Sequence, residues 1–466
     1  MSPVHNLSAW GSILCLVASA WAFDQFDETS YTAENLVKRD IVIVGGGASG
    51  TYAAIGLHDN GTSFVLVERN GRLGGQTETY KDPSSGTTVD YGVQAYHNDS
   101  ISRDFFSRLD VPIAAFTFGP PSTPTYVDFT SGTLLPSFVP GSLGTDYITQ
   151  LDKYPYLDDG FLLPNPVPQD LLLPWGQYIE KYSLQDSAWA TTVGRPAPPG
   201  PLLELPAIYV FNSFNPVEVS EGEGRDNAIV SASNDNSAIY VNALAELEAD
   251  ILLNSTVIAG DRSNGVKLVV ATPTGNKLIV AKQLVLGIHP VLDNMNPFGL
   301  DAREQSILSK LNGYPYYAGL VSNTGLSDAT LYQNVGADTE YNVPNLPCFS
   351  FFKPTFVQGQ FLYWYSALQP TTQAQVESAA TATINKLHMI AGTNVTAVPT
   401  FDAFANHLPF HLHVSTQDIT DGFYSDMYSL QGYHNTWYIG ALFVIGSSQL
   451  WNNTANMLPQ IIAAAS

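Results

Sequence analysis

Three glycines near the start of the chain have the spacing of a phosphate-binding turn. Gly45, Gly47 and Gly50 form a G-x-G-x-x-G pattern. Glu68 lies about 20 residues further on, where dinucleotide-binding folds carry an acid. Such glycines allow a tight turn, close approach of a pyrophosphate and close packing of a helix, while the acid accepts hydrogen bonds from ribose hydroxyls. The acid would repel a 2′-phosphate, so the spacing predicts a bound dinucleotide that lacks one.

The stretches beside this pattern have the composition needed to position it. Residues 41–44 and 64–67 are short apolar runs typical of buried parallel strands, and a helix-compatible segment beginning with Ala48 and Ser49 lies between them. The amino terminus of that helix would offer N–H groups and partial positive charge to phosphates. We interpret the arrangement as a βαβ unit; a glycine-rich turn in an unrelated α/β domain is the alternative.

The residues after the acid indicate which dinucleotide is bound. Arg72, Gly74 and Gly75 follow the acid in an R-x-G-G pattern, which resembles the extended fingerprint of the flavin amine oxidase superfamily. The resemblance implies that the arginine and the glycine pair fold over the pyrophosphate of FAD. Gln76 stands where that superfamily has a second arginine, so one phosphate contact differs. More narrowly, residues 45–94 resemble fungal β-cyclopiazonate dehydrogenase-like FAD-dependent oxidoreductases.

Two later segments resemble the other FAD-binding parts of the same superfamily. The resemblance implies that a backbone amide near Val257, in a run of short strands, meets the adenine. It also implies that a strand ending in Gly440 and Ala441, followed by a helix from about Ser447, meets the flavin. The N–H groups of that helix would stabilise negative charge at the N1–C2=O2 edge of the ring. A helix that only covers the sheet is the alternative.

Length and composition narrow the class of protein. The chain has 466 residues, 45% of them hydrophobic, which suffices for a large core and two intertwined domains. Its 19 Lys and Arg against 42 Asp and Glu give a net charge of −23, which disfavours nucleic acid and anionic membranes as partners. We expect no membrane span, because no apolar run approaches the about 20 residues that one requires.

The amino-terminal region has features of a secreted protein. Residues 1–22 resemble a signal peptide, although they contain no Lys or Arg, and a short anchor is the alternative. We expect residues 23–38 to form a pro-segment or disordered arm that ends in a candidate dibasic site, Lys38-Arg39; basic residues that flank a strand are equally consistent. Cys348 would be left without a disulfide partner once Cys15 is removed. Glycosylation sequons support secretion: Asn60, Asn98, Asn254, Asn394 and Asn452.

These patterns predict a mixed α/β (α+β) fold. It consists of a Rossmann-like FAD-binding domain with an interleaved substrate domain built on a mixed β-sheet and helices. We assign residues 39–105, 227–299 and 416–466 to the FAD-binding domain, and residues 106–226 and 300–415 to the substrate-binding domain. Aromatic strands at 349–352 and 360–365 and a helix at 377–390 fall in the substrate domain. Its aromatic residues either line an apolar pocket or belong to the ordinary core.

Catalytic residues are the least patterned part of the sequence. Amine oxidases commonly carry a lysine that holds a water at flavin N5, but the matching segment, residues 314–321, lacks lysine, and Lys353 is the nearest alternative. We predict that His434, Trp437 and Tyr438 form the substrate face of the flavin, with His434 moving a proton. Scaffold roles for these residues are equally consistent.

We therefore expect a secreted FAD-dependent oxidoreductase that abstracts hydride from a small aromatic or alkaloid-like secondary metabolite. The reaction would be an oxidation, a dehydrogenation or an oxidative cyclisation, with O₂ or another compound as electron acceptor. The alternatives are a flavin-dependent desaturase or isomerase of a terpenoid or polyketide pathway, and a secreted flavin-binding protein without turnover. We expect no metal site, since His411 and His413 are interpreted as a polar pair and not as ligands.

Overall fold

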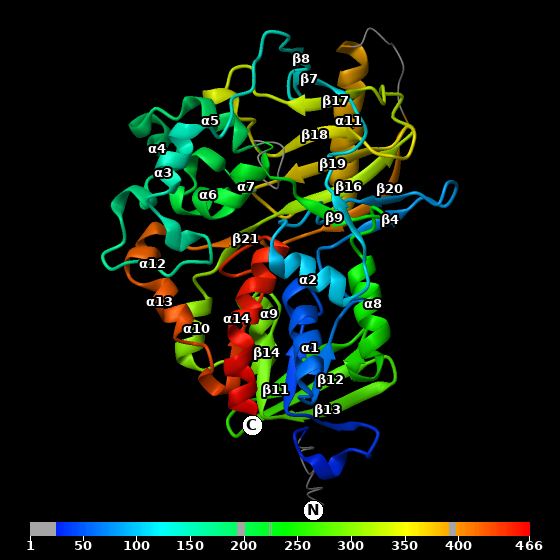
Figure 1. The fold of residues 1–466 in the computed structure, drawn as a ribbon, viewed down its shortest axis with the longest axis vertical. Coiled ribbons are helices and arrows are strands. Elements are labelled where there is room, and N and C mark those ends of the chain that lie inside the picture. The colour runs from blue at the N-terminus through cyan, green and yellow to red at the C-terminus, as the bar shows by residue number, and fades with distance from the viewer. Residues whose placement is uncertain (1–24, 193–200, 223, 225, 391–397) are drawn as a thin grey trace, which may run out of the picture.

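The computed structural model describes residues 25–192, 201–222, 224, 226–390 and 398–466. The chain passes alternately through two parts, one holding a parallel sheet with α1 and α14, the other holding a seven-stranded sheet with α11 (Figure 1). This alternation confirms the predicted mixed α/β fold. The predicted signal peptide and the sequon at Asn394 lie outside the described residues.

The parallel sheet collects short strands from the whole length of the chain. Its strand order is β10-β3-β2-β14-β22, and every neighbouring pair is parallel. The strands are β2 (Ile41–Val44), β3 (Phe64–Val67), β10 (Ile251–Leu252), β14 (Gln283–Leu286) and β22 (Thr436–Tyr438). Every residue of β2, β3 and β14 is buried, as expected for a parallel sheet covered on both faces. The two predicted strands at residues 41–44 and 64–67 are confirmed.

Two helices pack side by side on one face of this sheet. They are α1 (Ala48–Asn60) and α14 (Ser447–Ala465) (Figure 1). A Cβ atom at Gly56 would lie 2.6 Å from Leu458 Cδ1, so the helices are in close contact. Ile41 and Ile43 belong to the same apolar cluster as Trp451 of α14, whereas the alternate residues of β2 belong to the cluster on the other face.

An antiparallel meander adds a second small sheet of order β1-β13-β12-β11. Its strands are β1 (Leu36–Lys38), β11 (Thr256–Asp261), β12 (Val266–Thr272) and β13 (Gly275–Ala281). Strand β1 differs from the irregular arm expected for residues 23–38. It forms because Leu36 and Val37 pair with Leu278 and Ile279 of β13, an edge that would otherwise be exposed.

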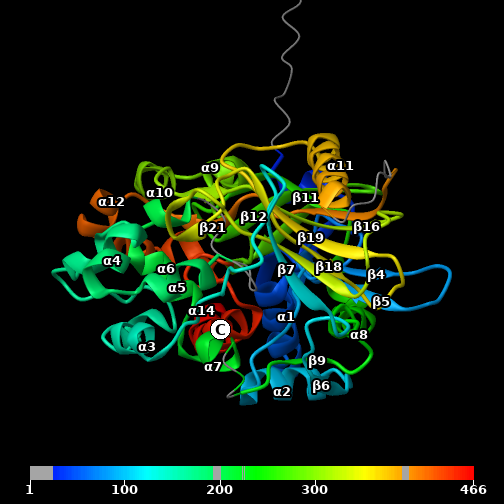
Figure 2. The ribbon, with the colours of Figure 1, turned by 90° about the horizontal axis from the view of Figure 1, so that it is seen from above.

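The seven-stranded sheet, which falls in the predicted substrate domain and is called the substrate-side sheet below, has the order β20-β16-β19-β18-β17-β7-β8. Its strands are β7 (Thr123–Asp128), β8 (Thr133–Leu134), β16 (Tyr316–Ser322), β17 (Thr330–Asn334), β18 (Cys348–Pro354), β19 (Phe361–Ser366) and β20 (Thr400–Asn406). Helix α11 (Gln373–Ile390) covers one face, seen from above in Figure 2. The other face packs on Val89 and Tyr91 of the predicted FAD-binding domain, called the cofactor side below, so the sheet lies between α11 and the segment that follows the glycine loop.

The remaining elements are short. The helices are α2 (Ser100–Arg108), α3 (Thr145–Leu151), α4 (Trp175–Tyr182), α5 (Gln185–Ala190), α6 (Ala207–Ser213), α7 (Pro216–Gly222), α8 (Ala238–Leu247), α9 (Leu292–Met295), α10 (Ala302–Leu308), α12 (Thr416–Thr420) and α13 (Phe423–Tyr428). The two-stranded sheets are β4 (Thr79–Lys81) with β5 (Thr88–Asp90), β6 (Ile113–Ala115) with β9 (Ile229–Ser231), and β15 (Asn312–Tyr314) with β21 (Phe410–His413). Trp175 and Tyr178 of α4 are core residues with no exposed surface. Among the described residues, no helix is both long enough and apolar enough to cross a bilayer.

Candidate functional site

The glycine turn lies between the carboxyl end of β2 and the amino end of α1. A Cβ atom at Gly50 would lie 1.8 Å from the Gly45 carbonyl oxygen, so no larger residue fits there without moving the turn. Gly47 is the N-cap of α1 and provides no side-chain cap. The first N–H groups of the helix are therefore left for an external acceptor.

Glu68 is held beside this turn by two backbone hydrogen bonds. The Gly46 N–H donates to Glu68 Oε2 (2.7 Å) and the Asn70 N–H donates to Glu68 Oε1 (2.8 Å). The residue is 5% exposed. Both carboxylate oxygens keep further lone pairs, so the acid can still accept hydrogen bonds from a ribose.

The R-x-G-G segment folds back over the first turn. A Cβ atom at Gly75 would lie 2.9 Å from Gly47 Cα, so the two glycine segments touch. Arg72 Nη1 donates to the carbonyls of Leu73 and Thr77, and Nη2 donates to the Gly75 carbonyl (3.0 Å). Arg72 also forms an ion pair with Glu78. Arg72 therefore holds the glycine loop in place through these carbonyl groups.

The other segments predicted to bind FAD, near Val257 and Gly440, approach the same edge of the parallel sheet as the glycine turn. Ser255, two residues before Val257, donates its N–H to the Glu68 carbonyl (2.9 Å). A Cβ atom at Gly440 would lie 2.9 Å from the Ile288 carbonyl, so the chain after β22 passes close to the chain after β14. Ala441 follows this close approach. The Gln76 carbonyl accepts the Val93 N–H (3.3 Å), which joins the glycine loop to the segment after β5.

The side chains of the three predicted catalytic residues make their hydrogen bonds away from this turn. His434 precedes β22, which runs parallel to β14 and β2, so it lies at the opposite end of the sheet from Gly45. Its Nε2 lies 3.2 Å from Asp301 Oδ2, and its side chain is 37% exposed. Trp437 Nε1 donates to Gln283 Oε1 (2.9 Å), at the amino end of β14.

Tyr438 is engaged in a buried ion-pair network. Its hydroxyl donates to Glu304 Oε1 (3.3 Å), and Glu304 pairs with Arg262 at 2.6 Å with both side chains almost fully buried. Burial raises the pKa of the Tyr438 hydroxyl well above its usual value, and the nearby Glu304 charge adds to the shift. These contacts indicate a structural role, because the polar groups of Tyr438, Glu304 and Arg262 satisfy one another at a distance from the glycine turn.

Two histidines that carry no sequence motif follow strands of the two main sheets. His289 lies three residues after the end of β14, at the carboxyl edge of the sheet where ligands of open α/β sheets bind. His407 follows β20 of the substrate-side sheet, and its ring stacks on Tyr316 (5.6 Å between centroids). Neither imidazole has a hydrogen-bond partner among the described residues. One comes from each part of the molecule.

The surroundings keep both imidazoles neutral. Burial lowers the pKa of His289 to about 4, and the positive charge of Arg69 acts in the same direction. Burial also lowers the pKa of His407 to about 4, with smaller effects from the charges of Arg72 and His289. Both rings are therefore neutral at neutral pH, and each keeps a ring nitrogen that can accept a hydrogen bond. Only the position of His289 after a buried strand could have indicated either histidine from the sequence.

Comparisons with known proteins agree with this geometry. A model of NAD(P)-binding Rossmann-like domains matches residues 43–109. The chain is 50% identical over 462 residues to FAD-dependent oxidoreductase dbaF of Emericella nidulans, covering 98% of each protein. It is 32% identical to the β-cyclopiazonate dehydrogenase of Aspergillus oryzae, covering 93% of this chain and 95% of that one. The chain belongs to this family of fungal FAD-dependent oxidoreductases. The resemblance inferred from the glycine segments is thus confirmed.

Solved structures similar to this oxidoreductase share its fold. The crystal structure of a CLA-producing fatty acid isomerase from P. acnes superposes with a TM-score of 0.72 at 16% identity, covering 91% of this chain and 98% of that chain. Putrescine oxidase bound to putrescine superposes with a TM-score of 0.61 at 14% identity, covering 92% and 100%. These similarities confirm the amine oxidase-like fold. At such low sequence identity they carry no information about the substrate or the reaction.

The residues of the turn fit the FAD of the family. Ser49 Oγ, on the second residue of α1, is buried and has no hydrogen-bond partner among the described residues. A buried hydroxyl needs such a partner, and at a helix amino terminus a phosphate oxygen supplies one. Ala48 and Ser49 would hold the pyrophosphate through their N–H groups, and Glu68 would hold the ribose.

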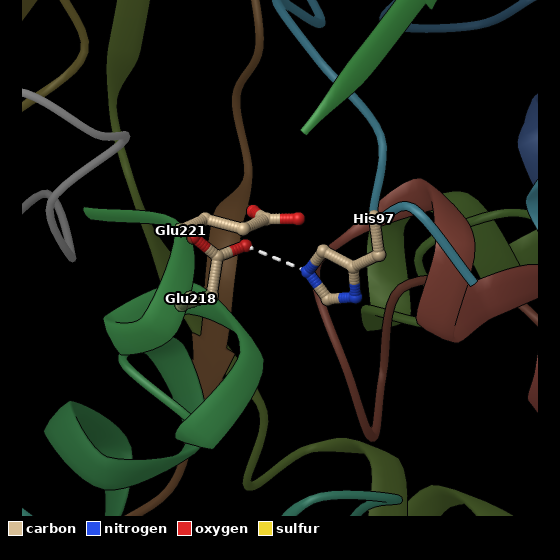
Figure 3. Close-up of side chains that lie close together, drawn as sticks. All are labelled: His97, Glu218 and Glu221. Atoms are coloured by element: carbon tan, nitrogen blue, oxygen red, sulfur yellow. Dashed lines mark hydrogen bonds and ion pairs between the residues drawn. The ribbon is translucent and has the colours of Figure 1, made fainter. Parts of the chain in front are cut away.

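A histidine and two glutamates join the cofactor side of this oxidoreductase to α7 (Figure 3). His97 Nε2 lies 2.9 Å from Glu218 Oε1, and the ligand atoms of His97, Glu218 and Glu221 lie within 4.8 Å of one another. The His97 N–H also donates to Ser448 Oγ in the first turn of α14 (2.9 Å). This contact ties α7 of the substrate side to the helix start predicted to face the flavin.

Two other sets of acidic or histidine side chains also form hydrogen bonds, ion pairs or ring contacts with neighbouring residues. Asp301, Glu304 and His434 form a second acid–histidine group, but Glu304 is already neutralised by its ion pair with Arg262. The rings of His411 and His413 do not converge. His411 Nε2 lies 2.9 Å from Ser213 Oγ, and His413 stacks on Tyr314 at 4.4 Å between ring centroids.

Proposed function

We propose that this FAD-dependent oxidoreductase removes hydride from a small, flat aromatic or alkaloid-like secondary metabolite. The aromatic face of the seven-stranded sheet carries the proposal. Tyr316, Phe351 and Trp364 cluster with Tyr91 of the cofactor side. The Tyr316 ring centroid lies 6.2 Å from that of Trp364 and 4.8 Å from that of Phe410. These rings are themselves buried, and an aromatic layer of this kind would favour a flat apolar ligand beside it and exclude water.

The chain's own residues would bind the substrate and move its proton. His289 and His407 are neutral at physiological pH, since burial lowers the pKa of each to about 4. A neutral imidazole can accept the proton of a substrate N–H or O–H while the neighbouring C–H bond is broken. Bound FAD supplies the acceptor for the electrons that leave the substrate carbon. The relative named β-cyclopiazonate dehydrogenase supports a dehydrogenation.

Anaerobic mixing of the purified holoenzyme with candidate substrates tests this proposal. An indole alkaloid should bleach the visible flavin absorbance, whereas an isoprenoid of similar size should not. Bleaching by the isoprenoid alone would favour a desaturase or isomerase of terpenoids. If neither these nor a panel of aromatic polyketides reduces the flavin, the proposed substrate class is wrong.

A secreted location, with O₂ as electron acceptor, completes the proposal. The signal-like residues 1–22 support secretion, and so does the exposure of Asn60, Asn98 and Asn254, where glycans could be attached. Expression in a filamentous fungus tests it. The enzyme should appear in the medium and move faster on a gel after glycosidase treatment, and the substrate-dependent formation of H₂O₂ should be detectable. Retention inside the cells would contradict the location.

A further inference from the structure

Lys353 on β18 buries its amino group without an ion partner. The residue is 4% exposed, and Nζ lies 3.1 Å from the centre of the Phe118 ring. Among the described residues, no carboxylate or other hydrogen-bond acceptor pairs with it, and burial alone lowers the pKa of its amine well below the usual value. Buried lysines are normally paired, because an isolated ammonium in apolar surroundings is costly.

Lys353 lines a cavity between the seven-stranded sheet and the cofactor side. The cavity has a volume of about 50 Å³, and since a single water needs about 10–15 Å³, it can hold a polar group of several atoms. Apolar and polar side chains both contribute to its wall, among them Val89, Phe116 and Leu362 with Thr88, Gln94 and Thr355.

We propose that this cavity binds the carboxylate group of a small apolar acid, with Lys353 as its counter-ion. The carboxylate would supply the charge that the amine lacks, and Lys353 would take up a proton as the ligand enters. The resulting hydrogen bond between two charged groups is strong where water is excluded.

The other titratable group of the cavity wall does not compete for the amine. Asp90 accepts hydrogen bonds from the Thr79 hydroxyl and the Asn236 N–H, so its carboxyl group is already satisfied. Burial raises the pKa of Asp90 to about 7, so it carries only part of a negative charge at neutral pH. The wall therefore combines a satisfied acid with an unsatisfied amine, which selects an anion over a cation.

Propionate binding to the full-length holoenzyme tests the site, with propionamide as the neutral isostere. In saturation-transfer NMR, propionate should bind and propionamide should not. Lys353→Met, which keeps the length of the side chain and removes the amine, should weaken propionate binding at least tenfold. Lys81→Met, at an exposed lysine of β4, should leave it unchanged. Equal binding to Lys353→Met and wild type, or equal binding of the acid and the amide, would overturn the proposal.

A chemical readout on the wild-type protein keeps the proposal testable if Lys353→Met does not fold. Formaldehyde with a borohydride reagent methylates accessible neutral amines, and mass spectrometry reports the extent at each lysine. Propionate should slow methylation of Lys353 severalfold and leave Lys81 unaffected, whereas propionamide should protect neither. Absence of protection would overturn the proposal. The readout does not involve reduction of the flavin, so its failure would leave the proposed oxidation untouched.

Discussion

The nucleotide side and the substrate side of the site are assembled from the chain in different ways. On the nucleotide side, Glu68 and Arg72 contact the glycine turns through backbone N–H and carbonyl groups, all within one continuous stretch. On the substrate side, Tyr316 and His407 come from separate segments and stack on one another through the pairing of β16 and β20, and His289 comes from a third segment, after β14. Contacts to the backbone demand particular residues at particular spacings, whereas a wall of packed side chains does not. The first kind of site therefore leaves a motif.

The largest effect is expected at the nucleotide side, from Gly50→Val. A Cβ atom here would lie 1.8 Å from the Gly45 carbonyl oxygen, so the turn must move or the helix must detach from β2. We expect purified protein with almost no bound FAD, measured as the ratio of visible to ultraviolet absorbance. Gly61→Ala is the control, because Gly61 has open space around its Cα and only its positive φ opposes the change, at a cost of about 1 kcal/mol. Normal flavin content in Gly50→Val would refute the close approach.

The second prediction compares two histidines on different sides of the sheet. His407→Phe keeps the ring stacked on Tyr316 but removes the proton acceptor, so kcat should fall about 100-fold, the usual range for loss of a general base. His434→Phe, at the exposed end near Asp301, should leave kcat within about twofold. Stopped-flow rates of anaerobic flavin reduction measure both. Equal losses in the two variants would return His434 to the reactive site.

This contrast also shows how far the sequence could lead. Residues 41–75 predict the strands, the turn and the cofactor, because each step depends on local spacing. From the sequence, His434 and Tyr438 are predicted to face the flavin because they belong to the carboxyl-terminal segment that resembles an FAD-binding part of the superfamily. A parallel strand places its two ends at opposite edges of the sheet, so His434, which precedes β22, lies away from the edge where Gly440 follows, whereas Tyr438 ends β22 at that edge and turns its hydroxyl to Glu304. Lys353 and His407 could not be placed, since their neighbours are decided by the pairing of β16, β18, β19 and β20.

The third prediction concerns pH. Burial lowers the pKa of folded His407 to about 4, against about 6.5 in the unfolded chain. Between these values the unfolded chain binds more protons, so the stability that the neutral ring contributes is complete above pH 6.5 and is lost as the pH falls toward 4. At pH 5 the loss is about 2 kcal/mol. Urea unfolding of His407→Phe should therefore show a smaller decrease between pH 7 and pH 5 than the wild type.

Asp90 should change the dependence of folding stability on pH in the opposite direction to His407, which provides a check on the effect assigned to His407. Its folded pKa of about 7 is raised by burial, so the folded protein binds more protons between pH 4 and pH 7, and this carboxyl group favours folding more at low pH. Asp90→Asn should steepen the loss of stability on acidification, whereas His407→Phe should flatten it. If both variants changed the acid-induced loss of stability in the same direction, the two pKa shifts assigned to burial would be wrong.

The smallest effect is expected for Glu68→Gln, and it tests whether the backbone contacts alone define the nucleotide side. The glutamine keeps an oxygen for the Gly46 N–H but loses the charge and one acceptor. A charged hydrogen bond is worth about 1.5–3 kcal/mol, so the Kd for FAD, measured by fluorescence titration of the apoprotein, should rise about tenfold. Glu248→Gln, at an exposed acid after α8, should leave the Kd unchanged. An unchanged Kd in Glu68→Gln would mean that the acid only braces the turn, and that the glycine spacing and the helix amino terminus hold the dinucleotide without it.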